Sequence, residues 1–198
     1  MCYDVCVPPF APMQFTWKQI LAVVGAVLLL WLWTSYNGLV TAREGVDAAW
    51  ANVEAQYQRR ADLLPNLVAS VRGASAFESE TLQQVTEART RWLGSENRSE
   101  RIAAAQEFDT AFARLLVTVE SYPALQATQA YRDLMVQLEG TENRIGVARK
   151  DYNDAVRTYN VHVKKFPTVI VARIGGFMPE VFFDAAPETG TAPTVEFP

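Results

Sequence analysis

The sequence predicts an all-α membrane protein. Its single N-terminal transmembrane helix continues into an antiparallel up-down-up-down four-helix bundle with a long two-helix membrane-proximal stalk. Three observations predict this fold. Residues 19–42 contain no charged side chain. Beyond them, apolar residues recur at alternating spacings of three and four, as in coiled coils and helical bundles. No alternation of apolar and polar residues, which would indicate strands, competes with this pattern before residue 167.

The uncharged segment, residues 19–42, is the predicted transmembrane helix. Spanning a bilayer takes about 20 apolar residues, and this segment is long enough. Trp17 and Trp33 suit the two membrane interfaces, where aromatic side chains gather. The alternative is a cleaved signal peptide, but bulky residues and then a helical pattern follow Trp33 instead of a small-residue cleavage site. We therefore expect a retained anchor.

The N-terminal leader, residues 1–18, holds both cysteines, Cys2 and Cys6. The rest of the chain therefore has no disulfide framework and no cysteine-based metal site. His162 is the only histidine, which excludes a site built on a histidine pair. We expect no cofactor and no metal. Translation starts at Met1 or at Met13, where a more ordinary anchor leader begins.

The predicted bundle occupies residues 43–167, and its first helix continues from the anchor to about residue 72. Pro65 should kink this helix because it removes one backbone hydrogen bond. Arg60 falls on the core-facing seam, which otherwise consists of apolar residues: Val46, Trp50, Val53, Tyr57, Leu64, Leu67 and Val71.

Three more helices follow. The first two are short, residues 79–93 and 102–121, and the dipeptide Tyr122-Pro123 ends the second, since a residue before proline leaves the helical region. The last helix, residues 128–166, has about 39 residues and a length of about 58 Å. Because the first and last helices are much longer than the second and third, all four can share a core only far from the membrane. Antiparallel pairing then matches residues whose numbers sum to about 200.

After Pro167, residues 168–184 form an apolar segment that is too short to span a membrane. Since the last helix returns to the bilayer, we expect this segment to pack on the base of the stalk or lie in the membrane interface. Residues 185–198 are rich in Pro, Thr and Gly and are expected to form a disordered acidic tail.

The net charge of −4 comes largely from the C-terminal part, and the bundle is nearly neutral. No basic block indicates nucleic-acid binding. The partners expected are the lipid bilayer, further copies of the chain in a homo-oligomer, and other membrane proteins.

A repeated dipeptide, Tyr152-Asn153 and Tyr159-Asn160, marks the stalk part of the last helix. Seven residues are almost two helical turns, so both pairs lie on one face. Two helices alone do not bury such a face fully, and asparagine there can fix register and oligomer state. Together with Trp50, these four residues are a candidate assembly interface. The alternatives are a ligand groove and ordinary core packing, of which aromatic residues at helical spacing favour packing.

Two adjacent arginines, Arg59 and Arg60, are a candidate anion-binding site. The register places Arg60 opposite Glu139 and Glu142. A paired Arg–Glu inside the bundle is the simpler interpretation, because an unpaired buried charge is strongly destabilising.

Several stretches resemble the LemA family of bacterial membrane-anchored helical proteins: SYNGLVTAREGVDAAWANVEAQYQRRADLLPNLV, ETLQQVTEAR, ESYPAL, LEGTENRIGVARKDYNDAVRTYN and GFMPEVFF. The resemblance spans residues 19–184 and implies a transmembrane segment, an antiparallel helical bundle and the bacterial inner membrane. It supplies no catalytic residue, and the sequence lacks the groupings that catalysis requires. We therefore expect a non-enzymatic single-pass membrane protein that presents a helical bundle for self-assembly or protein interaction. The alternative is a membrane-anchored sensor of a small anion, bound near Arg59 and Arg60.

Overall fold

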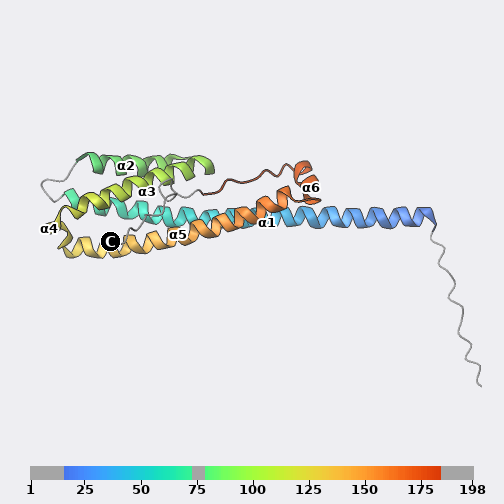
Figure 1. Cartoon of the computed structure of the whole chain (residues 1–198), viewed down its shortest axis with the longest axis horizontal. Coiled ribbons are helices and arrows are strands. Elements are labelled where there is room, and N and C mark those ends of the chain that lie inside the picture. The colour runs from blue at the N-terminus through green and yellow to red at the C-terminus, as the bar shows by residue number, and fades with distance from the viewer. Residues whose placement is uncertain (1–15, 73–78, 184–198) are drawn as a thin grey trace, which may run out of the picture.

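The computed structural model describes residues 16–72 and 79–183 of the chain (Figure 1). No strand occurs within these ranges, which confirms the all-α class. The helices are α1 (Trp17–Arg72), α2 (Ser79–Gly94), α3 (Arg98–Glu120), α4 (Pro123–Gln126), α5 (Gln129–Lys164) and α6 (Thr168–Ile174). The predicted acidic tail and most of the predicted leader lie outside the described residues.

The long helices α1 and α5 form an antiparallel pair, and α1 extends far beyond its partner at the N-terminal end (Figure 1). Trp50 packs edge-on against Tyr152, with ring centroids 5.2 Å apart. Ten residues further along α1, Arg60 forms an ion pair with Glu142 of α5. Both contacts match the register predicted from the helix lengths.

A second pair, α2 and α3, lies beside the distal parts of α1 and α5 and contacts them through side chains (Figure 1). The Tyr57 ring of α1 stacks on Trp92 of α2 at 5.8 Å. Ion pairs connect α1 to α3 at Asp47–Arg98 and at Glu54–Arg101. We call the region in which these four helices meet, from Asp47 outward, the head. The membrane-proximal remainder of the pair is the stalk.

One continuous core runs through head and stalk. Most of its apolar side chains come from α1, α2, α3 and α5, as the helical periodicity predicts, and α4, α6 and residue Phe183 supply the others. The largest of the completely buried side chains are Arg60, Tyr57, Tyr152, Tyr159 and Phe108.

The proline in α1 leaves the helix continuous but frees one carbonyl group. In a regular helix the N–H of residue 65 would bond to the carbonyl of residue 61, and Pro65 has no N–H. The side chain of Arg89 on α2 fills this role, since its Nε donates to the carbonyl oxygen of Ala61 at 2.7 Å. The predicted break in the hydrogen-bond ladder therefore becomes a contact between α1 and α2.

The third helix begins at Arg98, one turn before the predicted start at residue 102. Its N-cap is Asn97, whose side chain accepts a hydrogen bond from the backbone N–H of Glu100 at 2.9 Å. Asparagine followed three residues later by glutamate is a helix-start signal that apolar periodicity alone does not detect.

The N-terminal part of α1 packs against no other described element up to about Trp31. Its leucines and valines are exposed, and α1 is the one helix in the described residues that is long and apolar enough to cross a membrane. This exposure fits a segment whose natural surroundings are lipid instead of water.

The apolar segment after α5 has two parts. The short helix α6 packs on α1 and α5 and buries Val171 and Ala172. Residues 175–183, which we call the strap, then run back along the stalk to the head (Figure 1). Phe177 contacts Tyr36 with ring centroids 5.6 Å apart, and the strap ends with Phe183 buried against Tyr57 at 6.2 Å.

The packing of residues 168–183 on α1 and α5 agrees with the expectation that this segment packs on the base of the stalk, and it shows that the stalk does not consist of two helices alone. The structure gives the stalk additional cover, because α6 and the strap lie on α1 and α5. The periodicity of α1 and α5 could not reveal this cover, since an extended segment without helical pattern supplies part of it.

Candidate functional site

The head encloses a charged side chain, Arg60, which is only 1% exposed. Its Nη1 lies 2.7 Å from Oδ1 of Asp109 on α3, and its Nη2 contacts Glu142 on α5. The guanidinium also lies 5.1 Å from the centre of the Phe112 ring, within cation–π range. Three helices therefore meet at one buried cation, and its two ion pairs offset the cost of its desolvation.

The same carboxylate, Asp109, binds a second arginine. Arg149 of α5 contacts its Oδ2, and the hydroxyl of Tyr57 donates to that oxygen at 3.0 Å. Burial, opposed in part by Arg60, raises the pKa of Asp109 to about 7. Arg149 adds a second positive charge beside this carboxylate, which favours its ionised form.

This network supports the ion-pair interpretation of Arg60, and anion binding by the adjacent arginines stays a prediction. The predicted pairing of Arg60 with a glutamate of α5 is confirmed. Both terminal nitrogens of Arg60 are occupied by carboxylates, and Arg59 is exposed on the outside of α1. The structure thus does not bring Arg59 and Arg60 together into one cationic site.

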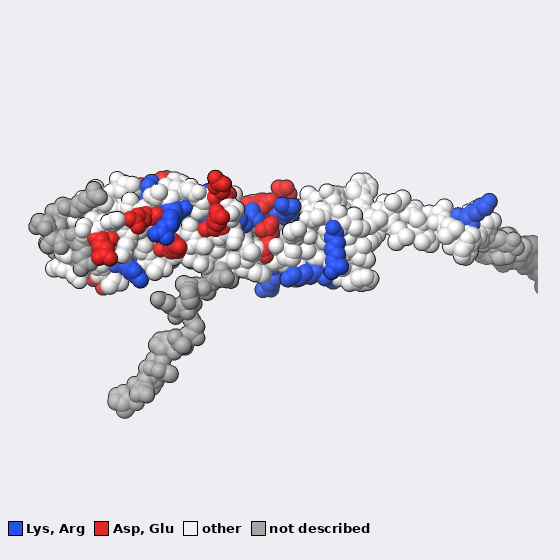
Figure 2. Space-filling view, turned by 90° about the horizontal axis from the view of Figure 1, so that it is seen from above, with Lys and Arg blue, Asp and Glu red and all other residues white. Residues whose placement is uncertain are grey.

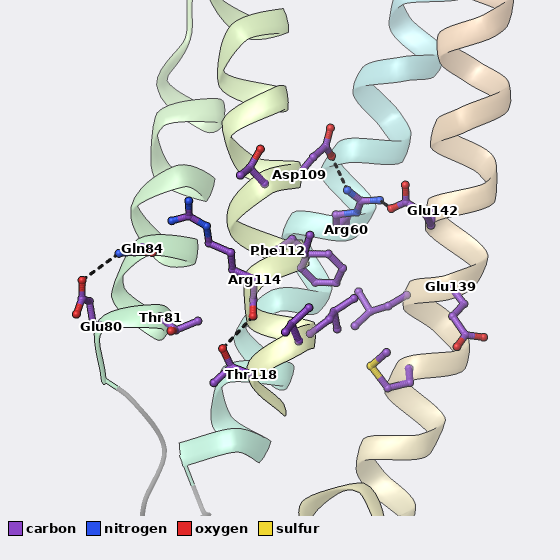
Figure 3. Close-up of a pocket in the computed structure, with 16 residues that line it drawn as sticks. Arg60, Glu80, Thr81, Gln84, Asp109, Phe112, Arg114, Thr118, Glu139 and Glu142 are labelled. Atoms are coloured by element: carbon purple, nitrogen blue, oxygen red, sulfur yellow. Dashed lines mark hydrogen bonds and ion pairs between the residues drawn. The ribbon is translucent and has the colours of Figure 1, made fainter. Parts of the chain in front are cut away.

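An open groove lies between α3 and α5, next to this network (Figure 3). Its volume is ≈ 1070 Å³. It arises because α3 packs closely on α2 and α5 packs closely on α1, which leaves the α3–α5 side of the head less filled. Apolar side chains in the lining come from α3 and α5: Phe112, Leu116, Val117, Met135 and Leu138.

The lining of the groove carries more negative than positive charge. The positive groups are Arg60 and Arg114, and the carboxylates are Glu80, Asp109, Glu139 and Glu142. Figure 3 shows Glu139 and Glu142 along α5, Arg114 and Thr118 on α3, and Glu80 with Gln84 on α2. An apolar floor between charged borders is suited to an amphipathic helix.

Sequence reasoning missed this groove, although one signal was present. On α3, Leu116 and Val117 lie beside the core positions Leu115 and Val119, which widens the apolar stripe beyond the core. Val117 is 66% exposed. Such additional apolar residues at the edge of a helix stripe indicate a face that the chain itself does not cover completely.

The repeated asparagines of α5 hold the strap. The side chain of Asn160 donates to the carbonyl of Glu180 at 2.8 Å and accepts from its N–H at 2.8 Å. Asn153 makes the same pair of bonds with Phe183, at 2.9 and 2.8 Å. Between them, the hydroxyl of Tyr152 donates to the carbonyl of Val181 at 2.7 Å. The two asparagines act as clamps on an extended backbone.

The spacing of the clamps follows from geometry. Seven residues of helix advance about 10 Å at 1.5 Å per residue. Three residues of extended chain cover about the same length at 3.3 Å each. Asn153 can therefore bind the backbone of Phe183 while Asn160 binds that of Glu180, three residues earlier in the strap. Arg98 adds an ion pair to Glu180 at 3.1 Å, which connects the strap to α3.

The predicted assembly residues thus have partners within one chain. Trp50, Tyr152, Tyr159 and Asn160 are buried, and Asn153 is half-buried beneath the strap. This burial agrees with ordinary core packing, one of the interpretations considered in the sequence analysis. Their use as a contact between copies of the chain stays a prediction.

Residues 49–197 match the sequence model of the LemA family. Magnetosome protein MamQ 2 of Paramagnetospirillum magneticum is 29% identical to the chain, and the similarity covers 87% of the chain and 72% of that protein. Magnetosome protein MamQ of Magnetospirillum gryphiswaldense is 27% identical with the same coverage. Protein LemA of Metamycoplasma hominis is 24% identical, over 69% of the chain and 63% of that protein.

Proposed function

Because the chain belongs to the LemA family, whose members are membrane-associated, we propose that it is a non-enzymatic scaffold of the bacterial inner membrane, with a head that binds a helix of a partner protein. In this proposal α1 crosses the membrane once. The head is then an up-down-up-down four-helix bundle, and its groove between α3 and α5 is the docking surface.

The observation that carries the proposal is the groove itself. Its floor exposes apolar side chains of α3 and α5, and an apolar surface in water favours a partner that covers it. The excess of carboxylates in its lining favours a helix whose apolar stripe is bordered by lysine or arginine. The anchor adds to this role, because it tethers the head to the same membrane as other anchored proteins and so raises their effective concentration around the groove.

A binding experiment tests the proposal with the full chain in nanodiscs. The probe is a fluorescent peptide with leucines at helical spacing and lysines beside them, compared with a peptide of the same composition in scrambled order. We expect only the patterned peptide to bind. Leu116→Lys should weaken its binding by about tenfold or more. Val147→Lys, at an exposed position of α5 that does not line the groove, should leave binding unchanged.

Two results would contradict the proposal. Equal binding of the scrambled peptide would show that charge, not a helical stripe, is recognised. An unchanged affinity of the Leu116→Lys protein would place the peptide elsewhere. The oligomeric state, measured by light scattering on the same samples, identifies the other possible occupant. A dimer that Leu116→Lys dissociates would assign the groove to a second copy of the chain.

A further inference from the structure

The membrane-facing end of the stalk has an exposed apolar surface that no described element covers. It includes side chains of the α5–α6 connection, of α6 and of the beginning of the strap. Ile174 is 81% exposed, Met178 76% and Phe166 75%, and Ile170 is also exposed. We call residues 164–178 the foot. Large apolar side chains with this much exposure are costly in water when they occur as a group.

The foot is also strongly basic. Lys164, Lys165 and Arg173 are exposed, and no acidic residue occurs from residue 155 to residue 179. The neighbouring part of α1, residues 16–43, likewise contains no acid. Figure 2 shows this separation on one face. Positive and negative groups mix over the head, whereas positive groups alone appear where the bundle ends and the bare part of α1 begins.

The level of the foot along α1 places it at the membrane surface. Phe177 contacts Tyr36 of α1, and Trp31 is partly buried against the same core. From Trp17 to Tyr36, α1 is about 30 Å long, which matches the hydrocarbon thickness of a bilayer. The part of α1 in contact with the foot is therefore the part that leaves the bilayer.

From these observations we infer that the foot binds the surface of the membrane and selects anionic phospholipids. Ile170, Ile174 and Met178 insert between the acyl chains, while the basic side chains bind the phosphate groups around them. An apolar helix bordered by cations is the usual composition of an interfacial membrane-binding element. The bilayer is the occupant because α1 enters it at the same level. This inference rests on the proposed membrane span of α1, but it does not depend on the docking groove at the other end of the molecule.

The test measures how deeply the foot lies in lipid, using the full chain in nanodiscs. In a background in which Cys2 and Cys6 are replaced by serine, a nitroxide label is attached at Ile174→Cys. Its accessibility to oxygen, which concentrates in lipid, is compared with its accessibility to a water-soluble nickel chelate. We expect the ratio to rise several-fold when phosphatidylglycerol is added to phosphatidylcholine, and to fall again at high salt.

Two controls show whether the effect belongs to the foot. Replacing its three cations, K164Q, K165Q and R173Q, should remove the response to phosphatidylglycerol. The matched change of three exposed head cations should preserve it: R59Q, R132Q and R144Q. A label at Val117→Cys in the head should stay in water in both kinds of lipid. An Ile174 label that stays in water in both would overturn the inference, as would equal immersion with and without anionic lipid.

Discussion

At the scale of single residues, the two adjacent arginines of α1 have opposite environments. Successive residues of a helix point about 100° apart, so Arg60 enters the core while Arg59 remains in solvent. The buried guanidinium then needs carboxylates, and α3 and α5 each supply one. The network therefore fixes how three helices fit together, because the charge of Arg60 is matched only when all of them are in place.

Arg60→Met should destabilise the head by about 3 kcal/mol, because it leaves the carboxylates of Asp109 and Glu142 without this cation. Denaturant unfolding of the full chain in detergent, followed by circular dichroism, measures the change. Arg59→Met is the matched control, since it removes the same charge one residue away from an exposed position. It should change stability by less than about 0.5 kcal/mol. Equal effects of the two substitutions would show that Arg60 is not held by its ion pairs.

At the scale of the elements, the strap is the part of the fold that depends most on side-chain hydrogen bonds. Only its first residues, up to Phe177, bond to the backbone of α6, so asparagine and tyrosine side chains of α5 bind the rest of its backbone. Its turn from α6 leaves little room for a side chain at residue 175. A Cβ there would lie 2.7 Å from the ring of Phe177, whose contact with Tyr36 closes the base of the stalk.

Asn160→Leu should release the middle of the strap while the helices stay folded. The substitution removes two hydrogen bonds of about 1 kcal/mol each, so hydrogen exchange at the amide of Glu180 should accelerate about 30-fold. Mass spectrometry of peptides that contain Glu180 measures this exchange rate. Asn143→Leu, at an exposed position of the same helix, should leave that exchange rate unchanged.

Replacing both Asn153 and Asn160 by leucine also tests the predicted assembly role. We expect the head to remain folded and the oligomer, measured by sedimentation, to change. An unchanged oligomer together with faster strap exchange would restrict both asparagines to their role within one chain.

At the scale of the whole molecule, α1 connects three environments without interruption. Its bare N-terminal part suits the bilayer, its middle pairs with α5 in the stalk, and its distal part enters the head (Figure 1). Because α5 returns alongside α1 and ends near the foot, the head rests on two helices instead of one flexible linker.

This arrangement predicts the height of the head above the membrane. From Leu39 to Arg72, α1 is about 50 Å long at 1.5 Å per residue. Electron microscopy of the full chain in nanodiscs should therefore show density that extends about 50 Å from the disc. A layer only about 25 Å thick, the width of two packed helices, would indicate that the head lies flat on the lipid.

Much of this fold could be predicted from the sequence. Apolar periodicity determined the core residues of the long helices, and the uncharged segment determined the candidate membrane span. The relative lengths of the helices determined the register, including the pairing of Arg60 with a glutamate of α5. These features depend on local pattern and on chain length, which a sequence contains in full.

The candidate site was decided by the tertiary structure. The α3–α5 groove exists because two helix pairs pack more closely within themselves than against each other, a balance that no single helix pattern records. The partner of Asn153 and Asn160 is an extended segment about 20 to 30 residues further along the chain, and extended segments have no period that marks what they touch. The sequence by itself therefore determined which faces need cover, and only the folded chain decided that the strap covers one of them and leaves the foot and the groove open.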